Sequence, residues 1–581
     1  MPREPSETGF KVNVSELLNS GWSPDRFYRN VPFWADVDAV DFTEHGIQKR
    51  GGVTDIVDLS SENIRGITTG TEYDTKVIYS GDLTSLWLYK LSDSSTKDVG
   101  STYSLSENGG STSWDSGTTT WDGGSTVWDE GLVEPSLWAF ANFGTWVLAV
   151  NGIDEPQIKK NNITFNDLLS GEISGGSVNS GGSGHALGDA FTFTGGTGTG
   201  FTATVTEVSG GAVTAFEITA FGSGFTDGDT LTQSTTTGSG TGLTVDVTVS
   251  DSPYINAYTI SQLGPHILMF NVSTSTSDSP FDFVWCSEDD PDTWVASSTN
   301  SAGSLTIREA DTELRAAVPL GRSLAVYTTD QMFLVNYIGA PFYFGYNTAL
   351  THGVGAVSKQ AVVSVSNKNY GLSKDGFFVT DGVTSQNIGK DNGINAYVKT
   401  NIAESEYAKV TAWHNKEYNE IVWNLPIGST AVNTEVIYNY SLGTWTKKTS
   451  DYTYGVSSGV FDNPVLGDNA GTIVYGNGGN NAFTASITSR AHDLDDADSI
   501  KELTSIRIGK LGEGAPTVKI GWADTPTVAP TYVDSFVLDN TFVEHILRTA
   551  GRYLFLDIES TSADAWEITD VVIQGRTGGT R

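Results

Sequence analysis

Two hairpin patterns between Leu314 and Gly382 constrain the fold of this chain more than any other feature. In each, an apolar strand meets a polar turn and returns as a second apolar strand. Residues 323–327 return as 332–337, and residues 370–372 return as 377–380 after Asp375-Gly376. Glycine in such a turn adopts positive φ without steric strain, so the pattern predicts antiparallel hairpins. Equivalent positions of the two hairpins lie about 45 residues apart, the length of one four-stranded propeller blade.

Similar strand and turn patterns recur from about residue 60 to 480 and predict a β-propeller of six or seven hairpins. The 65 glycines among 581 residues suit many short strands joined by tight turns, and helix-forming runs are scarce. Residues 394–410 are the main candidate for a short helix between blades. After about residue 490 the strands 505–508, 517–520, 553–558 and 566–573 predict a separate C-terminal β-sandwich. The expected fold class is therefore all-β.

Between residues 170 and 250 the composition changes to Gly, Ser, Thr and Ala with sparse apolar residues. The octapeptide GSGHALGD at 182–189 matches GSGFTDGD at 222–229, and alternating Thr and apolar residues follow each copy. This regular alternation predicts a small two-copy β module inserted into the propeller. The expected division is listed in chain order: 1–60, N-terminal strands packing with the C-terminal sandwich; 61–165, first part of the propeller; 166–252, inserted module; 253–485, remainder of the propeller; 486–581, C-terminal β-sandwich.

The formal net charge is −36, and the acidic residues are unevenly placed. Between Asp98 and Ile307 the basic residues are Lys159 and Lys160, against 24 Asp and Glu. One interpretation is a solvated, soluble surface, and the other is a surface that must not hold nucleic acid. The single cysteine, Cys286, excludes an intrachain disulfide. The sequence also predicts no signal peptide and no membrane-spanning segment.

A Trp-Asp dipeptide repeats every seven residues within 111–131. Exposed Trp beside Asp can bind sugar rings, but we favour an aromatic ladder that packs a projecting hairpin. If that hairpin projects from the propeller rim, its acidic side chains would form part of the surface that must not hold nucleic acid. These side chains are Asp115, Asp122, Asp129 and Glu130.

The sequence contains no HExxH, Walker A or GxGxxG pattern. No two of the seven histidines have metal-ligand spacing. The one candidate for Ca²⁺ is the acidic loop Asp493, Asp495, Asp496 and Asp498, which lacks the glycine and terminal glutamate of an EF-hand. We therefore expect no enzyme activity, no metal and no cofactor, although two acids from different blades could still converge as a glycosidase pair.

Several stretches, taken together and in order, resemble the tail nozzle (tail tube hub, or tail tubular protein B) proteins of short-tailed bacteriophages, the podoviruses. The resemblance extends, in order, over about two thirds of the chain, and the stretches that carry it are residues 46–52, 138–157, 285–294, 320–344, 369–382, 415–426, 436–447 and 551–560. Residues 287–294 also resemble the Asp-box turn of sialidase-like propellers, with Pro291 where that motif has glycine. The inserted module departs from the nozzle pattern.

The nozzle resemblance implies a β-propeller with a platform β-domain, here the C-terminal sandwich. It implies a homo-oligomeric ring, a hexamer, at the distal end of the tail in the virion, made in the host cytoplasm. The implied partners are the portal adaptor, tail fibres or spikes, and genomic DNA that passes without tight binding. The candidates to line the implied DNA channel are Asp115, Asp122, Asp129 and Glu130. The alternative is a carbohydrate-binding or glycan-degrading propeller that acts as a tail adhesin.

Overall fold

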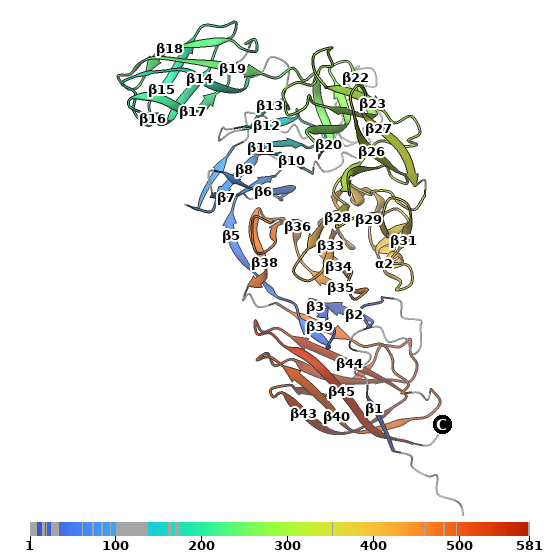
Figure 1. Ribbon diagram of the computed structural model, residues 1–581. Helices are drawn as coiled ribbons and strands as arrows, with labels where there is room; N and C mark the ends of the chain where they lie inside the picture. Colours follow the sequence, from blue (N-terminus) through green and yellow to red (C-terminus); the bar gives the residue numbers. More distant parts are fainter. Residues whose placement is uncertain are drawn as a thin grey trace, which may run out of the picture.

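The all-β prediction is confirmed: the chain folds into a propeller, a platform sandwich and an inserted module (Figure 1). The computed structural model describes residues 9–13, 18, 20–24, 34–60, 62–72, 75–82, 85–92, 94–99, 137–160, 165–168, 173–222, 224–350, 352–457, 459–479, 483–494 and 497–578. In this part, no helix is long and apolar enough to cross a bilayer.

The propeller has seven four-stranded blades. Blades 1 to 3 contain β6 (Gly66–Glu72), β7 (Thr75–Gly81), β8 (Leu86–Lys90) and β9 (Ser95–Asp98); β10 (Ala139–Phe143), β11 (Trp146–Val150), β12 (Gln157–Lys159) and β13 (Asn166–Asp167); and β20 (Tyr254–Leu263), β21 (His266–Thr274), β22 (Ser277–Trp285) and β23 (Gly303–Thr306). Blades 4 and 5 contain β24 (Ala316–Leu320), β25 (Ser323–Tyr327), β26 (Met332–Gly339) and β27 (Tyr343–Leu350); and β28 (Val362–Val365), β29 (Lys368–Ser373), β30 (Gly376–Thr380) and β31 (Ser385–Asn387). Blade 6 contains β32 (Thr411–Asn415), β33 (Glu420–Leu425), β34 (Thr434–Asn439) and β35 (Thr444–Thr449), and helix α2 (Ile394–Asn401) precedes it.

Blade 7 is completed by a strand from near the N-terminus. Its sheet contains β36 (Tyr452–Val456), β37 (Val465–Asp468), β38 (Thr472–Gly479) and then β5 (Gly52–Asp58), which pairs antiparallel with β38. The innermost strands β6, β10, β20, β24, β28, β32 and β36 contact one another in this order, and β36 contacts β6. The ring is therefore closed by a pairing between residues more than 400 positions apart in the sequence.

Each pair of neighbouring blades encloses its own apolar cluster. Blades 1 and 2, for example, pack around Trp138 and Phe165, and blades 3 and 4 pack around Phe270 and Phe333. Two-residue turns that join the first and second strands begin at Gly144, Gly264 and Gly321, all with positive φ. Blade repetition thus follows from the alternation of apolar strands and glycine turns.

The platform is a sandwich of two antiparallel sheets, ordered β3-β4-β45-β40-β43, with β1 on β45, and β2-β39-β44-β41-β42. Its strands are β1 (Gly9–Asn13), β2 (Asp36–Asp38), β3 (Val40–Phe42), β4 (Ile47–Lys49), β39 (Ala485–Thr488), β40 (Lys501–Leu511), β41 (Thr517–Ala523), β42 (Thr531–Val537), β43 (Phe542–Gly551), β44 (Tyr553–Ser560) and β45 (Glu567–Thr577). Strands β2 and β3 contact β35, and one continuous apolar cluster joins the platform to blades 5 and 6.

One expected division needs correction. The sequence pattern predicts that residues 1–60 form a single segment that packs with the C-terminal sandwich. The structure places β1 to β4 there, but β5 belongs to blade 7 of the propeller. The sequence does not reveal this pairing, because β5 is a short strand whose partner β38 is distant in sequence.

The inserted module forms a six-stranded sheet with its own apolar core, visible at one end of the molecule in Figure 1. Its strands are β14 (Ile173–Ser183), β15 (Ala190–Thr194), β16 (Thr202–Ser209), β17 (Ala212–Ala220), β18 (Thr230–Thr236) and β19 (Thr241–Val249), in the order β14-β19-β18-β15-β16-β17. If β14, β15 and β16 exchange places with β17, β18 and β19, respectively, the same strand order results, read from the opposite edge of the sheet. The two sequence copies are therefore related by a pseudo-twofold axis between β15 and β18.

We expect that deleting residues 170–250 and joining the ends with a short Gly-Ser linker leaves the propeller folded. Ile173 and Val249 are paired across β14 and β19, so the first and last strands of the module end side by side. Closing the gap adds little loop entropy. Thermal unfolding followed by near-ultraviolet circular dichroism should show the propeller transition changed by no more than about 1 kcal/mol.

The matched control removes β5 instead, by deletion of residues 52–58. This shorter deletion opens the ring and exposes the apolar faces of blades 7 and 1, so we expect loss of the cooperative transition. If both deletions abolish the cooperative unfolding transition, the module is not an independent folding unit.

Candidate functional site

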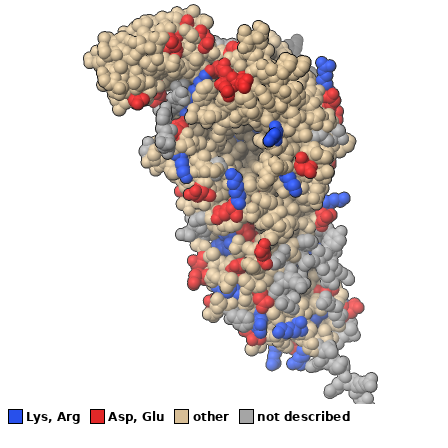
Figure 2. Space-filling model, viewed as in Figure 1, with Lys and Arg blue, Asp and Glu red and all other residues tan. Residues whose placement is uncertain are grey.

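The candidate site is a central cavity of about 610 Å³, enclosed by the innermost strands of all seven blades. A cavity of this size lies within the range of ordinary ligand pockets. Figure 2 shows a hollow in the propeller face, with blue Lys or Arg atoms at its edge. Small residues such as Ala412 and Gly455 line it. A Cβ atom on Gly455 would lie 2.7 Å from the ring of Trp413, so a glycine is needed there for close packing of blades 6 and 7.

One end of the cavity is closed by two side chains that cross the propeller axis. Lys359 and Gln360 precede β28 of blade 5, and both line the cavity. The Lys359 Nζ atom donates to the carbonyl of Asn151 at 2.6 Å and lies 4.2 Å from the ring centroid of Tyr258. The Gln360 amide donates to the carbonyl of Trp138 at 3.4 Å. Asn151 and Trp138 belong to blade 2, across the ring from blade 5, so these contacts block the axis.

The cavity lining carries cationic and neutral polar groups. Its charged side chains are Lys359 and Lys416, and no carboxylate lines it among the residues that the structure describes. Burial, together with the nearby Lys416 charge, lowers the pKa of His414 to about 4. His414 is therefore neutral at pH 7, and its Nε2 atom lies 3.1 Å from the hydroxyl of Tyr440.

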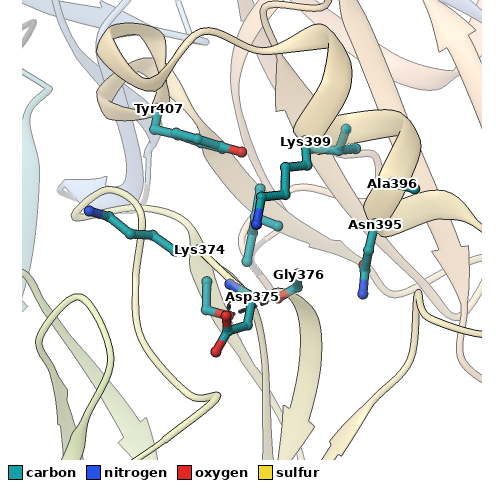
Figure 3. Close-up of a pocket in the computed structure, with 10 residues that line it drawn as sticks. Lys374, Asp375, Gly376, Asn395, Ala396, Lys399 and Tyr407 are labelled. Atoms are coloured by element: carbon teal, nitrogen blue, oxygen red, sulfur yellow. Dashed lines mark hydrogen bonds between the residues drawn. The ribbon is translucent and has the colours of Figure 1, made fainter.

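A second, smaller pocket of about 100 Å³ lies between the β29–β30 turn and α2 (Figure 3). Lys374, Lys399 and Tyr407 are arranged around it. Lys374 already forms an ion pair with Glu404 at 3.2 Å. This volume holds a few water molecules but not a ligand of ordinary size.

A buried ion cluster joins the platform to blade 6. The guanidinium of Arg50 contacts the carboxylates of Asp41 on β3 and Glu420 on β33, and all three side chains are buried. Glu435 and Lys448 lie beside them and are themselves 3.6 Å apart. Three carboxylates therefore share two cations. Burial, opposed in part by Arg50, raises the pKa of Glu420 to about 7, and burial also raises the pKa of Asp41.

Most site residues proposed from the sequence lie outside the described residues. These are Asp115, Asp122, Asp129, Glu130, Asp495 and Asp496. Of the Ca²⁺ candidates, Asp493 and Asp498 are described, and Asp493 is buried. In the described ranges, no group of three or more His, Cys, Asp or Glu side chains could hold a metal ion.

The Asp-box-like turn joins β22 to β23 in blade 3. Asp290 accepts hydrogen bonds from the backbone N–H of Asp292 at 3.2 Å and the hydroxyl of Thr293 at 2.8 Å. Trp294 is buried beneath the turn. These contacts shape the turn.

Sequence reasoning missed the residues that line and close the cavity. Lys359, Gln360, His414 and Lys416 stand at the ends of inner strands from blades 5 and 6. Nothing in their local sequence separates them from other polar strand ends. The available signal is positional: the lining residues of each blade lie in its first strand or next to it.

Comparison with known proteins gives no family match. No family model matches the chain, and no curated protein sequence matches it. Among solved structures, the chain is similar to an exo-β-1,3-galactanase from Phanerochaete chrysosporium with galactose, at 8% identity over 68% of this chain and 100% of that chain, with a TM-score of 0.22. It is also similar to the phage phi92 endosialidase, at 11% identity over 76% of this chain and 64% of that chain, with a TM-score of 0.26. Similarities at this level carry no inference about activity.

We expect Glu420→Gln to flatten the pH dependence of stability. Burial raises the pKa of Glu420 from its ordinary value of about 4.5, so between that pH and the raised pKa of about 7 the folded wild type binds more protons at this side chain than the unfolded chain does. The free energy of unfolding should therefore fall as pH rises through this window, by up to about 1.4 kcal/mol per pH unit. Urea denaturation at several pH values measures the slope. The control Glu417→Gln changes a nearby exposed acid and should keep the wild-type slope, and equal slopes in all three proteins would contradict the assignment.

We expect Arg50→Met to destabilise the fold by about 3–5 kcal/mol, because it leaves buried carboxylates without their cation. The loss should be smaller at pH 5, where the carboxylates accept protons, than at pH 8. Denaturation of the full chain at both pH values tests this. An equal loss at both would indicate that packing, not charge, is responsible.

Proposed function

We propose that this protein is a structural component of a short bacteriophage tail, the nozzle at its distal end. The ordered sequence resemblance supports this proposal, as does the combination of a propeller with a platform sandwich. In this role the chain assembles as a hexameric ring in the virion. It docks to the portal adaptor and to fibres or spikes, and it passes the genome during ejection.

The cavity lining is the observation that favours this role over a glycan-degrading propeller. Glycosidases of the common type need two carboxyl groups about 5–9.5 Å apart, one on each side of the scissile bond. The described lining residues offer lysines, a neutral histidine, amides and hydroxyls instead. This chemistry supports binding or assembly, and it supplies no acid pair in the cavity.

The closed end of the cavity also bears on the path of DNA. The major groove of B-DNA alone is about 12 Å wide, and Lys359 and Gln360 cross the propeller axis. We therefore place the proposed genome channel between copies in the ring and not through a single propeller. The net charge of −36 would keep passing DNA from being held.

Native mass and tail composition test the proposal. We expect light scattering of the purified chain, 62.0 kDa as a monomer, to report a hexamer, and mass spectrometry of purified tails to contain this protein. Incubation with host surface polysaccharide should release no reducing sugar. A monomer or trimer that releases sugar would overturn the nozzle proposal in favour of the tail adhesin.

A further inference from the structure

We propose that the central cavity binds the terminal unit of an acidic sugar. The carboxylate of the ligand pairs with Lys416, and its hydroxyl groups form hydrogen bonds with side chains of the inner strands. The proposal goes beyond the structural role and does not depend on it. Binding without turnover is compatible with a virion component.

Lys416 supplies the positive charge that would bind the ligand carboxylate. It lies at the end of the cavity opposite Lys359 and Gln360. Inner strands β28 and β32 run parallel, as the bridge between Gln360 and Thr411 shows. Lys359 and Gln360 precede β28, whereas Lys416 follows β32, so Lys416 lies at the other end. Lys416 is exposed and has no hydrogen-bond or ion-pair partner in the part of the chain that the structure describes. Lys359, in contrast, is buried and already engaged by Asn151 and Tyr258.

Several hydroxyl side chains also line the central cavity. Within the described residues, the hydroxyls of four lining side chains form no hydrogen bond with another residue: Thr259, Ser261, Ser364 and Ser457. They come from blades 3, 5 and 7, so they approach the axis from different sides. A ligand with several hydroxyls and one carboxylate matches this set, because each donor or acceptor in a small cavity needs a partner when water is displaced.

Charge selects the acidic form of such a ligand. His414 is neutral at pH 7, and no described lining residue carries a negative charge. The acidic surface elsewhere repels an anion only weakly beyond the Debye length of about 8 Å at physiological salt. The cavity is thus a basic site within a strongly acidic protein.

The closed end sets the size of the ligand. Lys359 and Gln360 prevent a chain from threading through the propeller, so only an end of a polymer or a free unit can enter. The volume of about 610 Å³ accommodates one or two sugar rings with water.

Ligand-observed NMR titration of the full chain tests the site with glucuronate and glucose, which differ only in the carboxylate at C6. We expect saturable glucuronate binding about tenfold tighter than glucose binding, the effect of one charge-assisted contact of about 1.4 kcal/mol. Lys416→Met should reduce glucuronate affinity to the glucose level and leave glucose unchanged. Ser364→Ala should weaken both sugars.

Lys374→Met is the matched control, since it removes an exposed lysine outside the cavity and should bind glucuronate like the wild type. Circular dichroism confirms that each variant is folded. Absence of saturable glucuronate binding, equal affinity for both sugars, or wild-type affinity in Lys416→Met would overturn the proposal. Acetate or inorganic phosphate that competes as well as glucuronate would overturn the assignment to a sugar. A ring that assembles without binding glucuronate would overturn this inference alone and leave the nozzle proposal standing.

Discussion

The structure depends on one antiparallel pairing, between β5 and β38. Each blade buries both faces against its neighbours, so a ring left open would expose the apolar faces of blades 7 and 1 together. The β5 strand supplies the last strand of blade 7 and, through Ile56 and Val57, part of the cluster between these two blades. Because β5 is continuous with β4 of the platform, the same pairing ties the two bodies to each other.

That connection places Arg50 directly between β4 and β5, beneath blade 6. Burying Arg50 with Asp41 and Glu420 removes three charges from water, and a buried ion cluster of this kind adds little net stability. The shared apolar cluster around Trp22 and Trp445 supplies the larger favourable contribution at this interface. The hydrogen bonds of the ion cluster are satisfied only when β3, the Arg50 segment between β4 and β5, and β33 are correctly placed. The cluster also makes the joint sensitive to pH through Glu420.

Ring closure determines the chemistry available at the centre. Seven inner strands leave a space along the axis, and the first residues of those strands can reach across it, as Lys359 and Gln360 do. The lining then combines short hydroxyl side chains from several blades with the exposed cation of Lys416. The inner strands run parallel, so the residues that precede them gather at one mouth of the cavity and the residues that follow them gather at the other. Lys359 and Gln360 close the first mouth, and Lys416 lies at the second. The molecule thus carries a basic cavity inside an acidic protein, whatever its place in a larger assembly.

The sequence by itself determined the local structure. The apolar runs and glycine turns around Gly376 predicted the hairpins, their spacing predicted blades, and the octapeptide copies at 182 and 222 predicted a two-copy module, because these features depend on neighbours within a few residues. Only the tertiary structure decided that there are seven blades, that β5 closes the ring, and that Arg50 meets Glu420 across 370 positions. It likewise decided that Lys359, His414 and Lys416 share one cavity. These outcomes depend on which strands lie next to one another around the ring, and a strand pattern with a period of two carries no information about its distant partner.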